Sequence, residues 1–162
     1  MPTTRADGST PMRHSHIAEG SPTGCAELDR ESGLVTEGLK ALAEEHPLAL
    51  VVKGHCMAPR LEPGSEIIVS PRRRYWPGDI LAFRSRQSEL RVHRLIGFHR
   101  RNSRLLLQTR ADASGTLDPP LLPEQVIGRV IAGPRAARVS LADRLTAAAR
   151  FVRLWRAGVF SR

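Results

Sequence analysis

Short apolar runs separated by turn residues fill the middle of this chain. They cover residues 48–53, 66–69, 79–83, 90–98, 103–109 and 125–132, and no helical period competes with them. Two Pro-Gly pairs, at 63–64 and 77–78, have the residue order that favours type II turns. The pattern predicts a mainly β domain over residues 47–134, with an antiparallel, barrel-type core. Residues 113–124 are rich in proline, so we expect them to form a loop that does not pair in the sheet.

A different periodicity flanks this domain on its N-terminal side. Within residues 25–46, apolar residues recur at near-helical spacing among five glutamates. The pattern predicts an acidic amphipathic helix that packs on the sheet and ends at Pro47. Its predicted packing residues are Leu28, Val35, Leu39 and Leu42.

A second helix is predicted near the C-terminus, within residues 135–162. Ser140 followed by Asp143 resembles a capping box, which marks a helix start. One apolar stripe follows, with arginines around it; it consists of Leu141, Leu145, Ala148, Val152, Trp155 and Val159. Such a basic amphipathic helix can cover the β domain, bind a partner, or make peripheral membrane contact through residues 140–159. The sequence leaves these readings open.

The remaining N-terminal residues, 1–24, are rich in Ser, Thr, Pro and Gly without periodicity, which predicts a disordered leader. The chain has no run of eighteen apolar residues and no apolar signal-peptide region, so we expect a soluble, cytoplasmic protein. Charge is uneven, because residues 1–46 carry four Lys/Arg against eight Asp/Glu, whereas residues 47–162 carry twenty-one against eight. The basic excess reflects either codon usage or an anionic partner such as a membrane surface or nucleic acid.

A short turn presents a candidate nucleophile. Val51 and Val52 end a strand, Gly54 breaks it, and Pro59 prevents a regular continuation. Between them lies Cys56, so its thiol is expected at the edge of the sheet. The only other cysteine is Cys25, and the two do not form a disulfide framework.

Five segments in this order resemble the signal peptidase I family and the related SOS-repressor-type peptidases. The first resembles the nucleophile box, in which a serine precedes Met-x-Pro, and the others resemble a Gly-Asp strand, the base-bearing strand, the box with a trailing aspartate, and the closing strand. In this chain they read Gly54-x-Cys56-Met57-x-Pro59, Gly78-Asp79-Ile80-Leu81-Ala82-Phe83, Val92-His93-Arg94-Leu95-Ile96-Gly97, Thr109-Arg110-Ala111-Asp112 with Asp118, and Gly128-Arg129-Val130.

The resemblance implies a peptidase, with Cys56 in place of the usual serine and His93 at the base position. Thiol and imidazole are a compatible nucleophile–base pair. Asp118, or else Asp112, would orient the imidazole, and the backbone N–H of Cys56 would stabilise the oxyanion. Residues Gly54, Met57 and Pro59 would contact an extended peptide, and no metal or cofactor is expected.

Three other readings compete with this one. The fold could be a catalytically inactive peptidase that binds a peptide or partner. His55, Cys56, His93 and His99 could form a zinc site, although their spacing matches no compact ligand motif. The basic charge could serve nucleic-acid binding, which is disfavoured because no DNA- or RNA-binding motif accompanies it.

Overall fold

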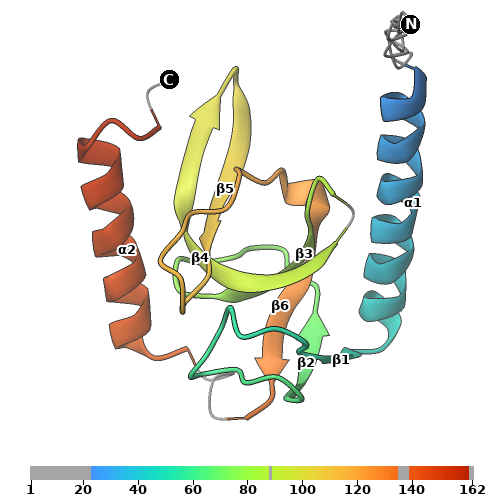
Figure 1. The fold of residues 1–162 in the computed structure, drawn as a ribbon, viewed down its shortest axis with the longest axis horizontal. Coiled ribbons are helices and arrows are strands. Elements are labelled where there is room, and N and C mark those ends of the chain that lie inside the picture. The colour runs from blue at the N-terminus through green and yellow to red at the C-terminus, as the bar shows by residue number, and fades with distance from the viewer. Residues whose placement is uncertain (1–22, 88, 135–138, 161–162) are drawn as a thin grey trace, which may run out of the picture.

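The computed structural model describes residues 23–87, 89–134 and 139–160, with side chains from Gly33 onward (Figure 1). Two helices flank six strands and one short 3-10 turn. In chain order the elements are α1 (Thr23–Glu45), β1 (Leu48–Val51), β2 (Glu66–Ser70), β3 (Ile80–Arg84), β4 (Leu90–Arg101), β5 (Arg104–Arg110), η1 (Pro123–Gln125), β6 (Val126–Ala132) and α2 (Leu141–Arg156). No helix in the described ranges is long and apolar enough to cross a membrane.

The six strands form one antiparallel sheet in the order β1-β2-β6-β3-β4-β5. The predicted mainly β architecture with an N-terminal and a C-terminal helix is therefore confirmed. The sheet is not closed into a barrel, since β1 and β5 are its two edges. The two helices lie on opposite flanks of the sheet, and the long β4 curves across the molecule between them (Figure 1).

The central strand β3 is buried on both faces and separates two hydrophobic cores. Ile80 and Ala82 pack into a first core with Met57 and Leu61, while Leu81 and Phe83 pack into a second core. Successive strand residues point to opposite faces, which explains why a run without polar alternation still forms a strand here.

Both predicted Pro-Gly turns are present. Gly64 and Gly78 have φ of 85° and 95°, the left-handed region that the third residue of a type II turn requires. Ser65 N–H donates to the Glu62 carbonyl at 3.0 Å, and Asp79 N–H donates to that of Trp76 at 2.9 Å.

The proline-rich segment 113–124 differs from its prediction. It makes two isolated antiparallel bridges to β5, Leu107↔Leu121 and Arg110↔Leu117. Leu121 follows two prolines but is not a proline itself. Its N–H is therefore free to donate to the Leu107 carbonyl, at 2.9 Å. The bridges tie this loop along β5, and this fixes the position of Asp118.

The predicted packing face of α1 is largely wrong. Among the α1 side chains that the structure describes, Thr36 and Ala43 are buried, and Leu39 is the member of the predicted set that packs on the first core. Val35 and Leu42 are exposed, and the side chain of Leu28 lies outside the described residues. Small side chains allow the helix to approach the sheet closely, so volume rather than hydrophobicity decides which face is buried.

The predicted start of α2 is confirmed, but its apolar stripe does not face the sheet. Ser140 is the N-cap, with Asp143 N–H donating to its Oγ at 3.1 Å and its own N–H donating to Asp143 Oδ2 at 3.0 Å. Ala147 is the buried residue of this helix, and the Phe151 ring covers Gly97 of β4. An ideal Cβ on Gly97 would lie 2.3 Å from that ring, so the absence of a side chain there permits this contact.

Candidate active site

Cys56 lies in the loop between β1 and β2. The loop is closed at its base, where Val52 N–H donates to the Ser65 carbonyl at 2.9 Å and Gly64 N–H donates to that of Val52 at 2.8 Å. Met57 is 0% exposed within the first core, and so is Leu61. These two buried side chains fix the short turn and leave the preceding Cys56 half-buried at the surface of that core.

The groups that would react at Cys56 are available. Among the described residues, its thiol makes no hydrogen bond, and its backbone N–H has no acceptor. A free N–H at this position can donate to an oxyanion. Catalytic hydrogen bonds are often long in the absence of substrate and shorten only in the complex, so an unpaired thiol is compatible with a nucleophile.

His93 and Asp118 form a buried pair. His93 lies on β4, and its Nδ1 is 2.7 Å from Asp118 Oδ2. Both side chains are less than a tenth exposed. A carboxylate at Nδ1 holds the ring in the tautomer that carries hydrogen there and leaves Nε2 as the acceptor. In the described part of the chain no group hydrogen-bonds Nε2, so the ring can take a proton from another group.

Several contacts fix the orientation of this pair. Thr109 Oγ1 donates to the same Asp118 Oδ2 at 2.7 Å, and Gln108 Nε2 donates to the Asp118 carbonyl at 2.6 Å. Asp118 N–H in turn donates to the Thr109 carbonyl at 3.0 Å. Phe83 meets the imidazole edge-on, with ring centroids 5.9 Å apart. The aspartate is therefore held through both its backbone and its side chain.

Asp112, the other candidate for orienting the histidine, has a different partner. Its carboxylate accepts from Arg94 Nε at 2.8 Å and from Arg94 Nη2 at 2.5 Å. Arg94 Nη1 donates further to the Gly78 carbonyl at 2.9 Å. This bidentate pair joins β4, the loop after β5 and the turn before β3. In the described ranges, Asp118 is therefore the carboxylate that contacts the imidazole.

One loop contacts both the cysteine and the histidine. Ala113 N–H donates to the Cys56 carbonyl at 3.0 Å, and Asp118 lies five residues further along the same loop. Five residues span at most about 18 Å, so this loop limits how far the thiol can lie from the His93–Asp118 pair.

The predicted substrate-contacting residues divide into two kinds. Gly54 and Pro59 are exposed beside Cys56 and free to meet a peptide. Met57 has no exposed surface, and so its observed role is packing rather than substrate contact. The segment that resembles the nucleophile box thus combines surface residues with a core residue.

Sequence reasoning missed several groups that position the site. The sequence assigns Thr109 to a motif and Gln108 only to a predicted strand run, although their place on β5 opposite the histidine strand was a usable signal. It also missed the pair between Arg60 and Asp143, which ties the cysteine loop to the first turn of α2. That arginine holds the pKa of the Asp143 carboxyl well below its usual range. No sequence pattern links residues so far apart.

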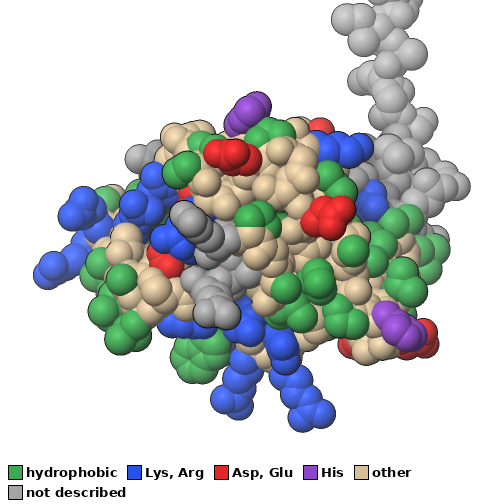
Figure 2. Space-filling view, turned by 90° about the horizontal axis from the view of Figure 1, so that it is seen from below, with side chains coloured by type: hydrophobic (Ala, Val, Ile, Leu, Met, Phe, Trp, Pro, Cys, Tyr) green, Lys and Arg blue, Asp and Glu red, His purple; other side chains and the backbone are tan. Residues whose placement is uncertain are grey.

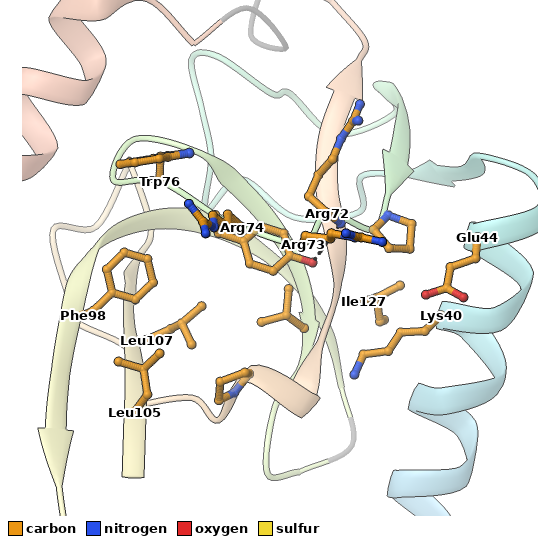
Figure 3. Close-up of a pocket in the computed structure, with 14 residues that line it drawn as sticks. Lys40, Glu44, Arg72, Arg73, Arg74, Trp76, Phe98, Leu105, Leu107 and Ile127 are labelled. Carbon is orange, nitrogen blue, oxygen red and sulfur yellow. Dashed lines mark hydrogen bonds between the residues drawn. The ribbon is translucent and has the colours of Figure 1, made fainter. Parts of the chain in front are cut away.

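A separate pocket of about 560 Å³ lies between α1 and the β4–β5 hairpin (Figure 3). Its floor is apolar, with Phe98, Leu107 and Ile127, and three consecutive arginines, 72–74, line it beside Trp76. Cys56, His93 and Asp118 do not line it. The three arginines and Trp76 therefore border a pocket distinct from the candidate catalytic residues.

Within the described residues, no group of three or more His, Cys, Asp or Glu side chains could hold a metal ion, so His55, Cys56, His93 and His99 do not form the alternative zinc site.

The family model described as Peptidase S24-like matches residues 14–131. A comparison with curated proteins finds no match. The family match supports the resemblance to the superfamily of signal peptidase I and the SOS-type repressors.

Proposed function

This chain belongs to the Peptidase S24-like family, and on that basis we propose that it is an endopeptidase whose nucleophile is Cys56. His93 acts as the base, and Asp118 orients it. The substrate is an extended peptide, and the reaction passes through an acyl-enzyme.

The proposed reaction has two halves. The Cys56 thiol gives its proton to His93 Nε2, and the sulfur attacks the scissile carbonyl carbon. The backbone N–H of Cys56 donates to the resulting oxyanion. The imidazolium then protonates the leaving amine as the C–N bond breaks, which leaves a thioester. His93 then takes a proton from a water molecule, whose oxygen attacks the thioester carbonyl. The C–S bond breaks, the acid product leaves, and the imidazolium returns the proton to the departing Cys56 thiolate.

The observation that carries this proposal is the hydrogen bond of 2.7 Å between His93 Nδ1 and Asp118 Oδ2. A structural histidine could also pair with an aspartate, and in a fully structural role its Nε2 often bonds a second protein group. Here Nε2 has none among the described residues, and the loop that carries Asp118 also contacts the cysteine turn. An imidazole oriented at one nitrogen and free at the other is what a general base requires.

Strand β1 is the proposed substrate platform. Within the described part of the chain it is an edge strand paired with β2, and it leads directly into the Cys56 loop. An extended peptide can add to such an edge through backbone hydrogen bonds. Val51, which is exposed, would lie beside the residues that precede the cleaved bond.

The decisive experiment uses a Cys25→Ala background, in which Cys56 is the single thiol. A proteome-derived peptide library is incubated with this protein and with its Cys56→Ala, Cys56→Ser and His93→Gln variants, and new termini are identified by mass spectrometry. We expect cleavage with Cys56 present, loss with alanine, and residual activity with serine. Cleavage that persists undiminished in Cys56→Ala would refute the proposal.

An inactive peptidase fold that binds a partner is the second candidate, and the arginine-lined pocket favours it. Iodoacetamide labelling separates the two at about pH 6.5, where an isolated thiol is largely protonated. Faster labelling than free cysteine, lost in His93→Gln, supports the enzyme. Labelling that is indifferent to His93, together with an absence of new peptide termini, supports the binding protein.

A further inference from the structure

The apolar stripe of α2 has no partner in the described structure. Its large side chains are strongly exposed: Leu141 is 72% exposed, Leu145 63%, Val152 50%, Trp155 63% and Val159 48%. Five residues of the predicted stripe lie within the helix itself: Leu141, Leu145, Ala148, Val152 and Trp155. At about 100° per residue, they fall in a sector of about 80°. This sector lies about a quarter turn from the face that carries Ala147 and Phe151 and packs on the sheet. The helix therefore has two apolar faces, and only one is covered.

A basic face adjoins the exposed stripe on the side away from the sheet. It consists of Arg150, Arg153 and Arg156, which are exposed and have no ion-pair partner among the described residues. The other charged residues of α2 are neutralised, because Asp143 pairs with Arg60 and Arg144 pairs with Asp79. Seen from below, hydrophobic and Lys/Arg surface lie side by side on the flank where α2 lies (Figure 2).

We propose that this surface of α2 lies on an anionic lipid bilayer. The stripe enters the boundary between headgroups and acyl chains, Trp155 sits at the headgroups, and the three free arginines contact lipid phosphates. The order of packed face, apolar stripe and basic face is the one that an interfacial helix needs while it remains attached to a folded domain. The cysteine loop would follow the helix to the membrane surface, since Arg60 binds Asp143 in its first turn.

Charge disfavours a second copy as the occupant. A symmetric contact between two α2 helices would bring the free arginines of both copies together without any acidic residue on that face. Anionic phosphates neutralise the same arginines, and each basic residue near such a surface contributes to binding.

The test uses the full chain and sedimentation with vesicles of phosphatidylglycerol or of phosphatidylcholine. We expect binding to phosphatidylglycerol at about 0.05 M salt, at least about tenfold weaker at about 0.5 M salt. Leu145→Ser with Trp155→Ser should weaken binding at least about tenfold, as should Arg150→Gln with Arg153→Gln. Leu90→Ser and Arg73→Gln, exposed residues of the same types elsewhere, are the matched controls. In a Trp76→Phe background, Trp155 fluorescence should shift to the blue on binding.

Absence of binding to phosphatidylglycerol would overturn the proposal. So would equal loss of binding in the controls, or an unshifted Trp155 emission. Sedimentation without vesicles tests for self-association of the protein. Self-association that Leu145→Ser abolishes would assign the stripe to a contact between copies instead. None of these results depends on peptidase activity, so this proposal and the proposed function fail separately.

Discussion

At the scale of single residues, three carboxylates from the family-like segments have three separate sets of partners. Asp79 is 0% exposed and accepts from Arg144 Nη2 at 3.0 Å and from the Trp76 N–H at 2.8 Å. Asp112 pairs with Arg94, and Asp118 with His93. Because each carboxylate is matched to its own donor, substitutions at the three positions should have different consequences.

Thr109→Val is expected to lower the rate of peptide cleavage while the fold is kept. The change removes the hydroxyl that donates to Asp118 at 2.7 Å and preserves the side-chain volume. A hydrogen bond to a charged group contributes about 1.5–3 kcal/mol, so a loss of roughly tenfold or more in kcat/KM is expected if Asp118 orients the base. Thr109→Ser, which keeps the hydroxyl, should retain most activity. Equal rates in the two variants would show that this bond does not support catalysis.

Asp112→Asn and Asp118→Asn should separate stability from activity. Arg94 is buried, and loss of its charged partner leaves an uncompensated cation, which costs about 3 kcal/mol or more. Urea unfolding should therefore show the larger loss of stability for Asp112→Asn. Asp118→Asn should affect cleavage more than stability. The opposite ranking by the two measurements would mean that Asp118 is structural.

The sequence alone identified part of this candidate site. Motif order singled out Cys56, His93, Asp112 and Asp118, but it did not choose between the aspartates. The choice depends on the register of β4 against β5, which pairs Arg94 with Arg110, and on the bridges that carry the following loop back along β5. Register and long-range bridging are properties of the folded sheet, and the catalytic roles themselves stay predictions.

At the scale of elements, the position of α2 is determined by one close approach rather than by its most apolar face. The Phe151 ring occupies the space where Gly97 would have a Cβ, and the turn at Gly78 lies against Arg144. A glycine in a strand often marks such an approach.

Gly97→Ala should therefore loosen α2 from the sheet. Its Cβ would meet the Phe151 ring at 2.3 Å, and overpacking of this kind costs about 1–3 kcal/mol. Thermal unfolding should report a lower midpoint. Gly38→Ala in α1 is the matched control, because nothing lies within 4 Å of its Cβ position and the change should raise stability by up to about 1 kcal/mol. An unchanged midpoint in Gly97→Ala would contradict this account of the helix position.

The contact between Phe151 and Gly97 illustrates why strands were easier to predict than the packing faces of helices. The predicted strand runs agree with β1 to β6 within a few residues, because turn residues delimit them locally. For both helices, the sequence identified an amphipathic segment; it assigned the wrong packing face to α1 and did not determine which face of α2 packs on the sheet. A helix buries the face whose shape fits its neighbour, and that fit, Phe151 on Gly97 or Ala43 of α1 on the sheet, involves residues distant in sequence.

At the scale of the whole molecule, α2 is held to the β domain at both ends by titratable groups. At its start, Asp143 pairs with Arg60 of the cysteine loop. Beyond its end, Phe160 stacks on His99 of β4, with ring centroids 4.7 Å apart, and on Phe151 at 5.2 Å. The two attachments respond to acid in different pH ranges.

Burial lowers the pKa of His99 below its ordinary value, with Arg101 adding to the effect, and its buried Nδ1 has no hydrogen-bond partner among the residues that the structure describes. The unfolded chain thus binds a proton more readily than the folded one. Stability from this group is present above about pH 6.5 and is lost as the pH falls through the lower folded pKa. For Asp143, whose folded pKa is also depressed, the contribution is present above about pH 3.9 and is lost only as the pH falls further.

Acidification should therefore release the C-terminal end of α2 before its N-terminal end. Hydrogen exchange, corrected for the intrinsic pH dependence, is expected to accelerate for the amides of residues 151–157 as the pH falls below about 6.5, while those of residues 144–147 stay protected until the pH falls below about 4. His99→Gln should remove the first change and Asp143→Asn the second, because each variant lacks the titrating group. If His99→Gln left the early acceleration intact, a group other than this histidine would control the attachment of the helix end.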